Sequence, residues 1–295
     1  MIKKTFIRAI EFWVPDARGT LLEFGGGLFG TATRFGANSR NLCFGRGEGL
    51  PGQAWEAGHP VILHQLSAPM FRREASARAN GLTCAMALPI FQGDRLTSVV
   101  VLFCGDDQDH AGAIELWQNN PVANVDMELL DGYYGSTGDT FEFLSRNTSF
   151  RAGTGLPGRA WARRAPVFMP DLGRGSGFLR ADSAVQVGIN RGFAIPGSCT
   201  DGNHYVLAFL SALTTPIASQ VDVWEPAVDA SKLVHSFGFS EATGAPSTPS
   251  EDAQNLVGEL VQRVFSSGVP AVSANTLYFP VSAQDRATAV MGLAL

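Results

Sequence analysis

Short apolar stretches alternate along the chain with clusters of turn-forming residues. Residues 82–91 and 96–103 are almost continuously apolar, and the Gln-Gly-Asp segment at 92–94 between them is typical of a hairpin turn. Residues 72–80 are rich in Ala, Arg and Glu, which favour a helix, and Gly81 would end it. The pattern predicts an α+β fold in which a central antiparallel sheet is flanked by short helices.

A glycine-rich segment predicts a second short helix. Residues 47–55 read GEGLPGQAW. Pro51 suits the first helical position, because the N–H that proline lacks would be unused there, and Gly58 is a suitable left-handed cap. We expect the helix to run through Trp55, whose ring then packs in a core.

The same segment occurs again 106 residues later, as GTGLPGRAW at 153–161 (153 − 47 = 106). The match continues one residue out of step, as a short loop insertion would produce. It includes an aromatic residue, an arginine and a serine at equal spacing: Phe71, Arg73 and Ser76, then Phe178, Arg180 and Ser183. We therefore expect two copies of one domain, at residues 1–107 and 108–214.

A fainter third copy is predicted at residues 215–295. Its strand at Trp224 corresponds to the strands at Trp13 and Trp117 in the other copies. The two proline landmarks that lie 29 residues apart in copy one, at 60 and 89, are only 10 apart in copy three, at 270 and 280. The third copy is therefore expected to be shortened.

These segments resemble the GAF family. The resemblance rests on the Gly-x-Gly-Leu-Pro-Gly-x-Ala-Trp segment, the Pro-Val strand after it, and residues 81–90 (GLTCAMALPI) and 188–196 (GINRGFAIP). It implies a central antiparallel sheet, one face of which is covered by a variable stretch of helix and loop that encloses a ligand pocket. We call this stretch the lid. The third copy lacks it, so no pocket is expected there.

The lid carries the strongest candidate binding residues. For a binding site, Phe71 and Phe178 would wall a cavity, while Arg73 and Arg180 would offer a planar fork to a carboxylate or phosphate. The hydroxyls of Ser76 and Ser183 would add a hydrogen bond. In the alternative interpretation the aromatic rings pack on the sheet, and the arginines pair at the surface with Glu74 and Asp182. Both interpretations remain open.

Two further residues are candidates because they lie on the strand that is expected to face the pocket. Cys84 in copy one is matched by Arg191 in copy two, which differs in size and charge. If both pockets bind, they are expected to bind different molecules. The alternative to a binding role is that Cys84 is simply a buried thiol in a core.

Composition narrows the class of protein. The chain has 295 residues, of which 45% are hydrophobic and 17% charged, a globular balance. No apolar run approaches the roughly 20 residues of a membrane-spanning helix, and the beginning does not resemble a secretion signal, so a cytoplasmic location without membrane contact is expected. Residues 215–295 hold eight acids and three bases, which accounts for the net charge of −5 and leaves no basic face for nucleic acid.

Candidate chemistry beyond the lid is sparse. The four cysteines and five histidines show no metal-binding spacing, and no metal site is expected. The segment 47–52 fits a Gly-x-Gly-x-x-Gly fingerprint, but a proline lies inside it and no acid follows at the distance that dinucleotide binding requires. No cofactor is therefore predicted.

The leading hypothesis is a non-catalytic sensor that binds a small, anionic molecule under its lids. It would signal through a separate protein partner or through self-association, for example as a homodimer. The alternative is an interaction or scaffold protein with vestigial pockets, whose acidic third copy docks a partner. A third hypothesis is an enzyme like the free methionine-(R)-sulfoxide reductases of the GAF family. It is the weakest of the three, because Pro51 and Arg78 stand where that enzyme would need cysteines.

Overall fold

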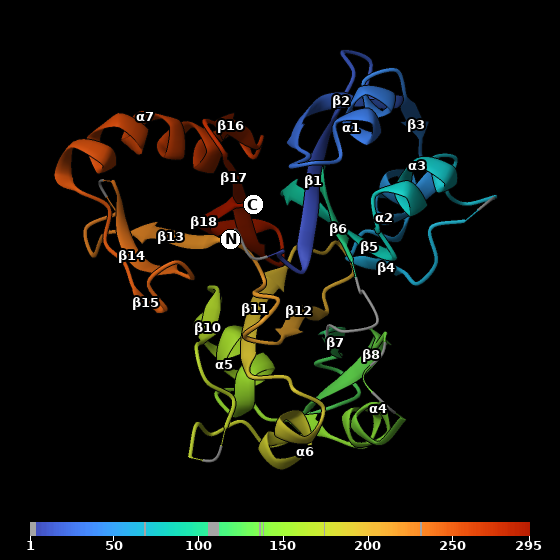
Figure 1. Cartoon of the computed structure of the whole chain (residues 1–295). Coiled ribbons are helices and arrows are strands. Elements are labelled where there is room, and N and C mark those ends of the chain that lie inside the picture. Colours follow the sequence, from blue (N-terminus) through green and yellow to red (C-terminus); the bar gives the residue numbers. More distant parts are fainter. Residues whose placement is uncertain are drawn as a thin grey trace.

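The computed structural model describes residues 4–67, 69–105, 112–135, 137, 139–173, 175–230 and 232–295. These residues form three six-stranded antiparallel sheets with helices on the outside (Figure 1). We call each sheet with its helices a unit. The predicted boundary at 107/108 lies outside the described residues, and that at 214/215 lies between the second and third sheets.

Unit one contains a sheet of strand order β3-β2-β1-β6-β5-β4. Its strands are β1 (Ile7–Pro15), β2 (Leu21–Leu28), β3 (Cys43–Gly45), β4 (Val61–Leu63), β5 (Cys84–Gln92) and β6 (Arg95–Cys104). Its helices are α1 (Thr33–Ser39), α2 (Gly49–Ala57) and α3 (Glu74–Ala79). Gly58 caps α2 in the left-handed conformation, with φ of 70°, as predicted.

Unit two repeats this order along its own segment of chain. Its strands are β7 (Gly112–Asn119), β8 (Met127–Tyr133), β9 (Ser149–Phe150), β10 (Val167–Met169), β11 (Arg191–Gly197) and β12 (His204–Ser211). Its helices are α4 (Asp139–Arg146), α5 (Gly155–Arg163) and α6 (Ala181–Gln186). Residues 64–83 in unit one and 170–190 in unit two are the lids, which contain α3 and α6.

Unit three also has a six-stranded sheet of the same order. Its strands are β13 (Gln220–Pro226), β14 (Leu233–Ser240), β15 (Ala245–Pro246), β16 (Ala271–Ser273), β17 (Thr276–Ala283) and β18 (Arg286–Ala294). Only residues 274 and 275 connect β16 to β17, where the other units have a lid. The sheet is instead covered by α7 (Glu251–Ser267), 17 residues long against 9 in α2 and α5.

The prediction of repeated antiparallel sheets is confirmed, although the helical share is smaller than an α+β class implies. The length of α7 was not predicted. Ser250 caps its start, where the hydroxyl accepts a hydrogen bond from the Ala253 N–H, and Gly268 caps its end in the left-handed conformation.

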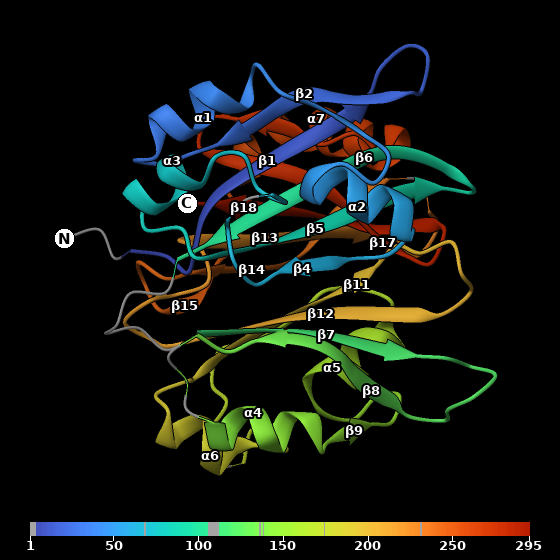
Figure 2. The ribbon, with the colours of Figure 1, turned by 90° about the vertical axis from the view of Figure 1, so that its right-hand side faces the viewer.

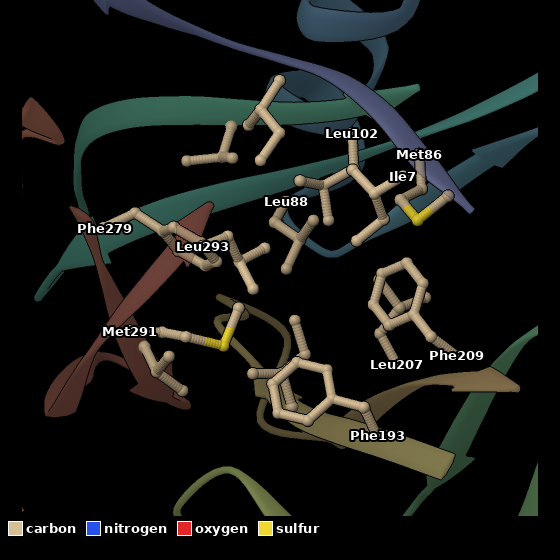
Figure 3. Close-up of a cluster of buried hydrophobic side chains, with 14 of the residues drawn as sticks. Ile7, Met86, Leu88, Leu102, Phe193, Leu207, Phe209, Phe279, Met291 and Leu293 are labelled. Carbon is tan, nitrogen blue, oxygen red and sulfur yellow. The ribbon is translucent and has the colours of Figure 1, made fainter. Parts of the chain in front are cut away.

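The three sheets pack face to face on one apolar core, which we call the shared core (Figure 3). Strand β5 illustrates why. Its alternate side chains Met86, Leu88 and Ile90 point into the shared core, whereas Ala85 and Ala87 point to the lid side. Each sheet is thus buried on both faces, which explains why its central strands are continuously apolar.

The shared core has contributions from every unit. Members labelled in Figure 3 are Ile7, Met86, Leu88 and Leu102 from unit one, Phe193, Leu207 and Phe209 from unit two, and Phe279, Met291 and Leu293 from unit three. The helices lie outside this core, on the opposite face of each sheet (Figures 1 and 2). Any site covered by a lid therefore faces away from the other units.

Polar contacts close the boundaries between units. The Ser198 hydroxyl accepts a hydrogen bond from the Phe91 N–H at 3.1 Å and donates one to the Gln284 carbonyl at 2.8 Å, so a single side chain joins all three units. The Gly58 carbonyl accepts from the Thr200 N–H at 3.1 Å, and the Gly268 carbonyl accepts from Ser98 at 2.8 Å. Helix ends of one unit thus meet the hairpin of the next.

Glycine is required at the helix ends that form these boundaries. Gly58 and Gly268 both have φ of 70°, and a Cβ atom at either would lie within 2.4 Å of a threonine hydroxyl in the next unit. The threonines are Thr200 and Thr97. A larger residue would therefore strain the backbone and push the units apart.

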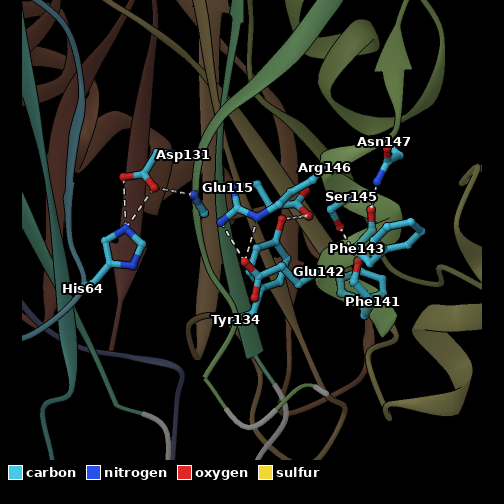
Figure 4. Close-up of polar contacts among 11 residues, drawn as sticks. His64, Glu115, Asp131, Tyr134, Phe141, Glu142, Phe143, Ser145, Arg146 and Asn147 are labelled. Atoms are coloured by element: carbon cyan, nitrogen blue, oxygen red, sulfur yellow. Dashed lines mark hydrogen bonds and ion pairs between the residues drawn. The ribbon is translucent and has the colours of Figure 1, made fainter. Parts of the chain in front are cut away.

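An ion pair between His64 and Asp131 joins units one and two (Figure 4). His64 Nε2 donates to the carboxylate at 2.9 Å, and both side chains are partly exposed, at 45% and 36%. The hydrogen bond to Asp131 raises the pKa of His64.

This pair predicts a pH-dependent contribution to stability. Because the pKa is raised in the folded chain, the contribution is fully present below the ordinary histidine pKa of about 6.5 and is lost as pH rises through the raised value. Urea unfolding should show Asp131→Asn less stable than wild type by under about 1 kcal/mol near pH 6, since solvent screens the pair. The difference should shrink near pH 9. A difference that grows with pH would contradict this account, and His64→Gln is the control that should remove the dependence.

Candidate functional site

The two lid arginines lie beneath their lids, not at the surface. The side chains of Arg73 and Arg180 are 6% and 3% exposed. Each immediately precedes the short lid helix and points back to the sheet of its own unit. Burial of a guanidinium requires an anionic partner, and in both units that partner is a glutamate from the first strand of the sheet.

In unit one the partner of Arg73 is Glu11 on β1, which is fully buried. The two guanidinium nitrogens donate to the two carboxylate oxygens at 2.7 and 2.9 Å. Glu11 also accepts from the Ser39 hydroxyl at 2.8 Å and from the Trp13 indole N–H at 3.1 Å. The rings of Phe35 and Phe71 lie 4.2 and 5.1 Å from the guanidinium carbon.

Unit two builds the same arrangement around Glu115 on β7. Arg180 donates to both carboxylate oxygens, at 2.8 Å for the Nη2 contact. The Trp117 indole donates at 3.1 Å and the Tyr134 hydroxyl at 3.2 Å (Figure 4 shows Glu115 and Tyr134). Ser145 accepts from Arg180 and donates to a carbonyl of its own helix.

The carboxylates are saturated by these contacts. Glu11 and Glu115 each accept four hydrogen bonds, close to the capacity of a carboxylate. Burial, followed by the charge of Glu115, raises the pKa of Tyr134, so that its hydroxyl stays protonated and donates. The protein's own carboxylate thus occupies the position on the arginine fork that an anionic ligand would need.

Little space remains under lid one, and a large aromatic side chain is buried under each lid. In unit one a cavity of about 10 Å³ is lined by Glu11, Arg73, Phe71 and Phe103 among others, room for about one water molecule. Phe71 and Phe178 are 5% and 4% exposed and pack against the sheets. The aromatic rings therefore fill the space that the sequence predicted as a pocket.

The predicted lid serines do not join this cluster. Ser76 and Ser183 lie on the lid helices and are half-buried, and the Ser76 carbonyl accepts from Asn80 at 2.7 Å. The serines that contact the arginines are Ser39 and Ser145, one residue before the Arg-Asn pairs that match between the copies. The expected surface pairing with Glu74 and Asp182 is replaced by the buried glutamates.

Cys84 lies on the other face of the sheet. Its side chain belongs to the shared core and faces Cys104 on the neighbouring strand. The expectation that it faces the lid pocket is therefore corrected: residues 84, 86, 88 and 90 alternate toward the shared core. Burial, with the hydrogen bond to Cys84, raises the pKa of Cys104, so its thiol stays protonated.

Arg191 also lies outside the Glu115 cluster, although its Nη1 donates to the Pro170 carbonyl at the start of lid two. It is at the boundary of units two and three, where its Nε donates to Glu241 at 3.0 Å. Its guanidinium lies 5.0 Å from the centre of the Phe239 ring. This arginine joins two units and takes no part in the Glu115 cluster.

The glutamates were missed at the sequence level, although a signal was present. An acid stands two residues before the tryptophan in each unit: Glu11 before Trp13, Glu115 before Trp117, and Asp222 before Trp224. A bulge in the strand precedes every one of these tryptophans. An acid repeated inside an otherwise apolar strand indicates a buried partner.

Unit three retains the acid without the arginine. Asp222 accepts from Gln220 at 2.7 Å and pairs with His235 at 2.9 Å, and both members of this pair are buried. The histidine comes from the adjacent strand β14. The loss of the lid is thus compensated locally by a partner from within the sheet.

The outer surfaces of the two lids differ in polarity. In unit two, three large apolar side chains are exposed on α4 and the lid: Phe143 at 65%, Leu179 at 58% and Val185 at 58%. The matching positions of unit one hold Ala37, Arg72 and Arg78. Helices α4 and α6 lie side by side (Figure 2). We call Phe143, Leu179 and Val185 together the lid-two patch.

Comparisons with known proteins find solved structures that are similar to about one third of the chain. No family model and no curated protein matches the chain. The free methionine-R-sulfoxide reductase from Neisseria meningitidis, in complex with its substrate, is 20% identical over 33% of this chain and 52% of its own, with a TM-score of 0.27. An nlh2 GAF domain from A. aeolicus is 17% identical over 34% and 59%, with a TM-score of 0.28.

A third solved structure is NreA from Staphylococcus aureus, mutated in its nitrate binding site. It is 13% identical over 34% of this chain and 74% of its own, with a TM-score of 0.27. The chain spans about half the length of the first two structures. Each match extends over about one third of the chain. The role of the site is therefore argued from its own geometry.

The buried pairs predict a large asymmetry between single and double substitutions in unit two. Arg180→Met leaves Glu115 buried without its cation and should lower the free energy of unfolding by about 3–5 kcal/mol. Adding Glu115→Leu removes the stranded charge, so the double variant should recover a large part of that loss. Urea unfolding of wild type, both single variants and the double variant measures the coupling. Additive effects, or a loss below about 1 kcal/mol for Arg180→Met, would contradict a structural role for this pair.

Proposed function

We propose that the chain is a non-catalytic, GAF-related regulatory protein that acts through contact with another protein. The proposal is carried by the contrast between the two lids. Both are closed underneath by a buried Arg–Glu pair, but only lid two exposes a group of large apolar side chains. Apolar groups gathered on a surface are typical of interaction sites.

The closed lids support this proposal over small-molecule sensing. A ligand pocket usually has several hundred Å³ of space and a few unsatisfied polar groups. Here the cavity under lid one measures about 10 Å³, and the guanidinium forks are occupied by Glu11 and Glu115. Opening either lid for an anion would require the exchange of a buried intramolecular ion pair for an intermolecular one.

The absence of catalysis is part of the same proposal. Among the described residues, no group of three or more His, Cys, Asp or Glu side chains is placed to hold a metal ion. The described helices also include none that is long and apolar enough to cross a membrane. The cysteines of the shared core, Cys84 and Cys104, are fully buried.

A small-molecule sensor is the second candidate, because the lid-one cavity is lined by both members of an ion pair, Glu11 and Arg73. An anion could compete there with the carboxylate. Nitrate, phosphate or a short carboxylate that bound under the lid would add about 2.7 kcal/mol of stability at 100 times its dissociation constant. If the chain acts through contact with another protein, we expect no such stabilisation from these anions.

The proposed contact surface predicts a position-specific cross-link. A photo-reactive phenylalanine analogue in place of Phe143 should capture a protein partner in cells, because that side chain is the most exposed of the lid-two patch, at 65%. The same analogue in place of Ala37, the matching position of unit one, is the control and should capture much less.

Replacement of the patch by its unit-one counterparts, Leu179→Arg with Val185→Arg, should remove the cross-link at 143 while leaving the unfolding transition unchanged. Equal capture from positions 37 and 143, or capture that survives the double substitution, would contradict the assignment. Capture of a second copy of this chain would show that the chain is its own partner, in a homodimer.

A further inference from the structure

An open groove lies at the boundary of units one and three, away from both lids. Its volume is about 530 Å³, within the range of small-molecule binding sites. Its walls are the β1–β2 hairpin at 16–19, Trp55 of α2, the β5–β6 hairpin at 94–97, Ser267 at the end of α7 and Val269 after it.

The walls of this groove are held in place. The Asp16 carboxylate accepts from the backbone N–H groups of Thr20 and Leu21 at 2.7 and 3.1 Å, which fixes the β1–β2 hairpin. On the opposite side, Thr97 donates to the Gly268 carbonyl at 2.9 Å, which ties the β5–β6 hairpin to the end of α7. The groove is therefore preformed, and little ordering is needed on binding.

Two arginines of the groove are available to bind an anion. The side chains of Arg18 and Arg95 line it, are exposed, and have no hydrogen-bond or ion-pair partner among the residues that the structure describes. The two acids of the lining, Asp16 and Asp94, balance the two arginines in formal charge, and Asp16 is hydrogen-bonded within its own hairpin. An anion is favoured by the two unpaired guanidinium groups, each of which can bind an anionic group with two hydrogen bonds.

The remaining lining is suited to a flat apolar group. Trp55 is partly buried and offers an aromatic surface, and Val14, Leu96 and Val269 add apolar area. An aromatic ring stacks readily on an indole while its charged end stays near the arginines.

The matching tryptophan of unit two has a ring partner. Trp161, which matches Trp55, packs against the His204 ring with centroids 5.7 Å apart. The groove itself is formed where units one and three meet.

We propose that this groove binds a small organic anion with a flat apolar body, such as an aromatic carboxylate or an aryl phosphate. The ring lies against Trp55, and the anionic group lies between Arg18 and Arg95. This site is independent of the proposed function, since it involves neither lid nor the lid-two patch. A ligand there contacts units one and three together and so strengthens their boundary.

The probe for this site is 1-naphthyl phosphate, titrated into the full chain in a calorimeter. The expected result is saturable binding of one molecule per chain. Inorganic phosphate lacks the ring and 1-naphthol lacks the charge, so both should bind at least about tenfold more weakly. The affinity for 1-naphthyl phosphate should fall as salt is raised, because the arginines are exposed.

Arg18→Gln and Arg95→Gln should each weaken binding of 1-naphthyl phosphate by about tenfold or more. Arg46→Gln, an exposed arginine of unit one outside the groove, is the matched control and should leave the affinity unchanged. The site would be overturned by no saturable heat at millimolar probe, by 1-naphthol binding as tightly as its phosphate, or by an affinity that the groove arginines do not affect. The cross-link from position 143 is unaffected by any of these results.

Discussion

The burial of each sheet on both faces is the constraint on which the remaining structure depends. One face of every sheet lies in the shared core, and the other is covered by the helices of its own unit. Each buried Leu, Met or Phe of the shared core stabilises the chain by about 1.5–3 kcal/mol. The units are therefore held together by the same interaction that folds each of them. Ser198, which bridges three units, adds direction to an otherwise non-directional contact.

The lid clusters are the second consequence of this arrangement. Because the inner face is taken by the shared core, the outer face of each sheet needs its own closure, and a buried Arg–Glu pair with aromatic rings supplies it. Such pairs contribute less to net stability than well-packed apolar residues would, but they fix the lid in one position. Unit three closes the same face with the long helix α7 and a His–Asp pair. Two solutions to one packing problem thus occur in a single chain.

The repeat, the antiparallel sheets and the left-handed cap at Gly58 could be predicted from the sequence, because matching segments and turn residues act locally. The face to which Cys84 points could not, since a strand that is apolar on both sides gives no alternation to read. The partner of Arg73 was also missed: Glu11 is 62 residues away in the chain. Only a comparison of the acids before Trp13, Trp117 and Trp224 would have pointed to it. The groove at Arg18 and Arg95 depends on the contact between units one and three, which no local pattern encodes.

Calorimetric unfolding of the full chain tests the shared core most directly. If the three sheets are stabilised by one core, the chain should unfold in a single transition whose calorimetric and van't Hoff enthalpies agree. Three separate transitions, or a fragment of residues 4–105 that unfolds cooperatively with the stability it has in the full chain, would contradict the account.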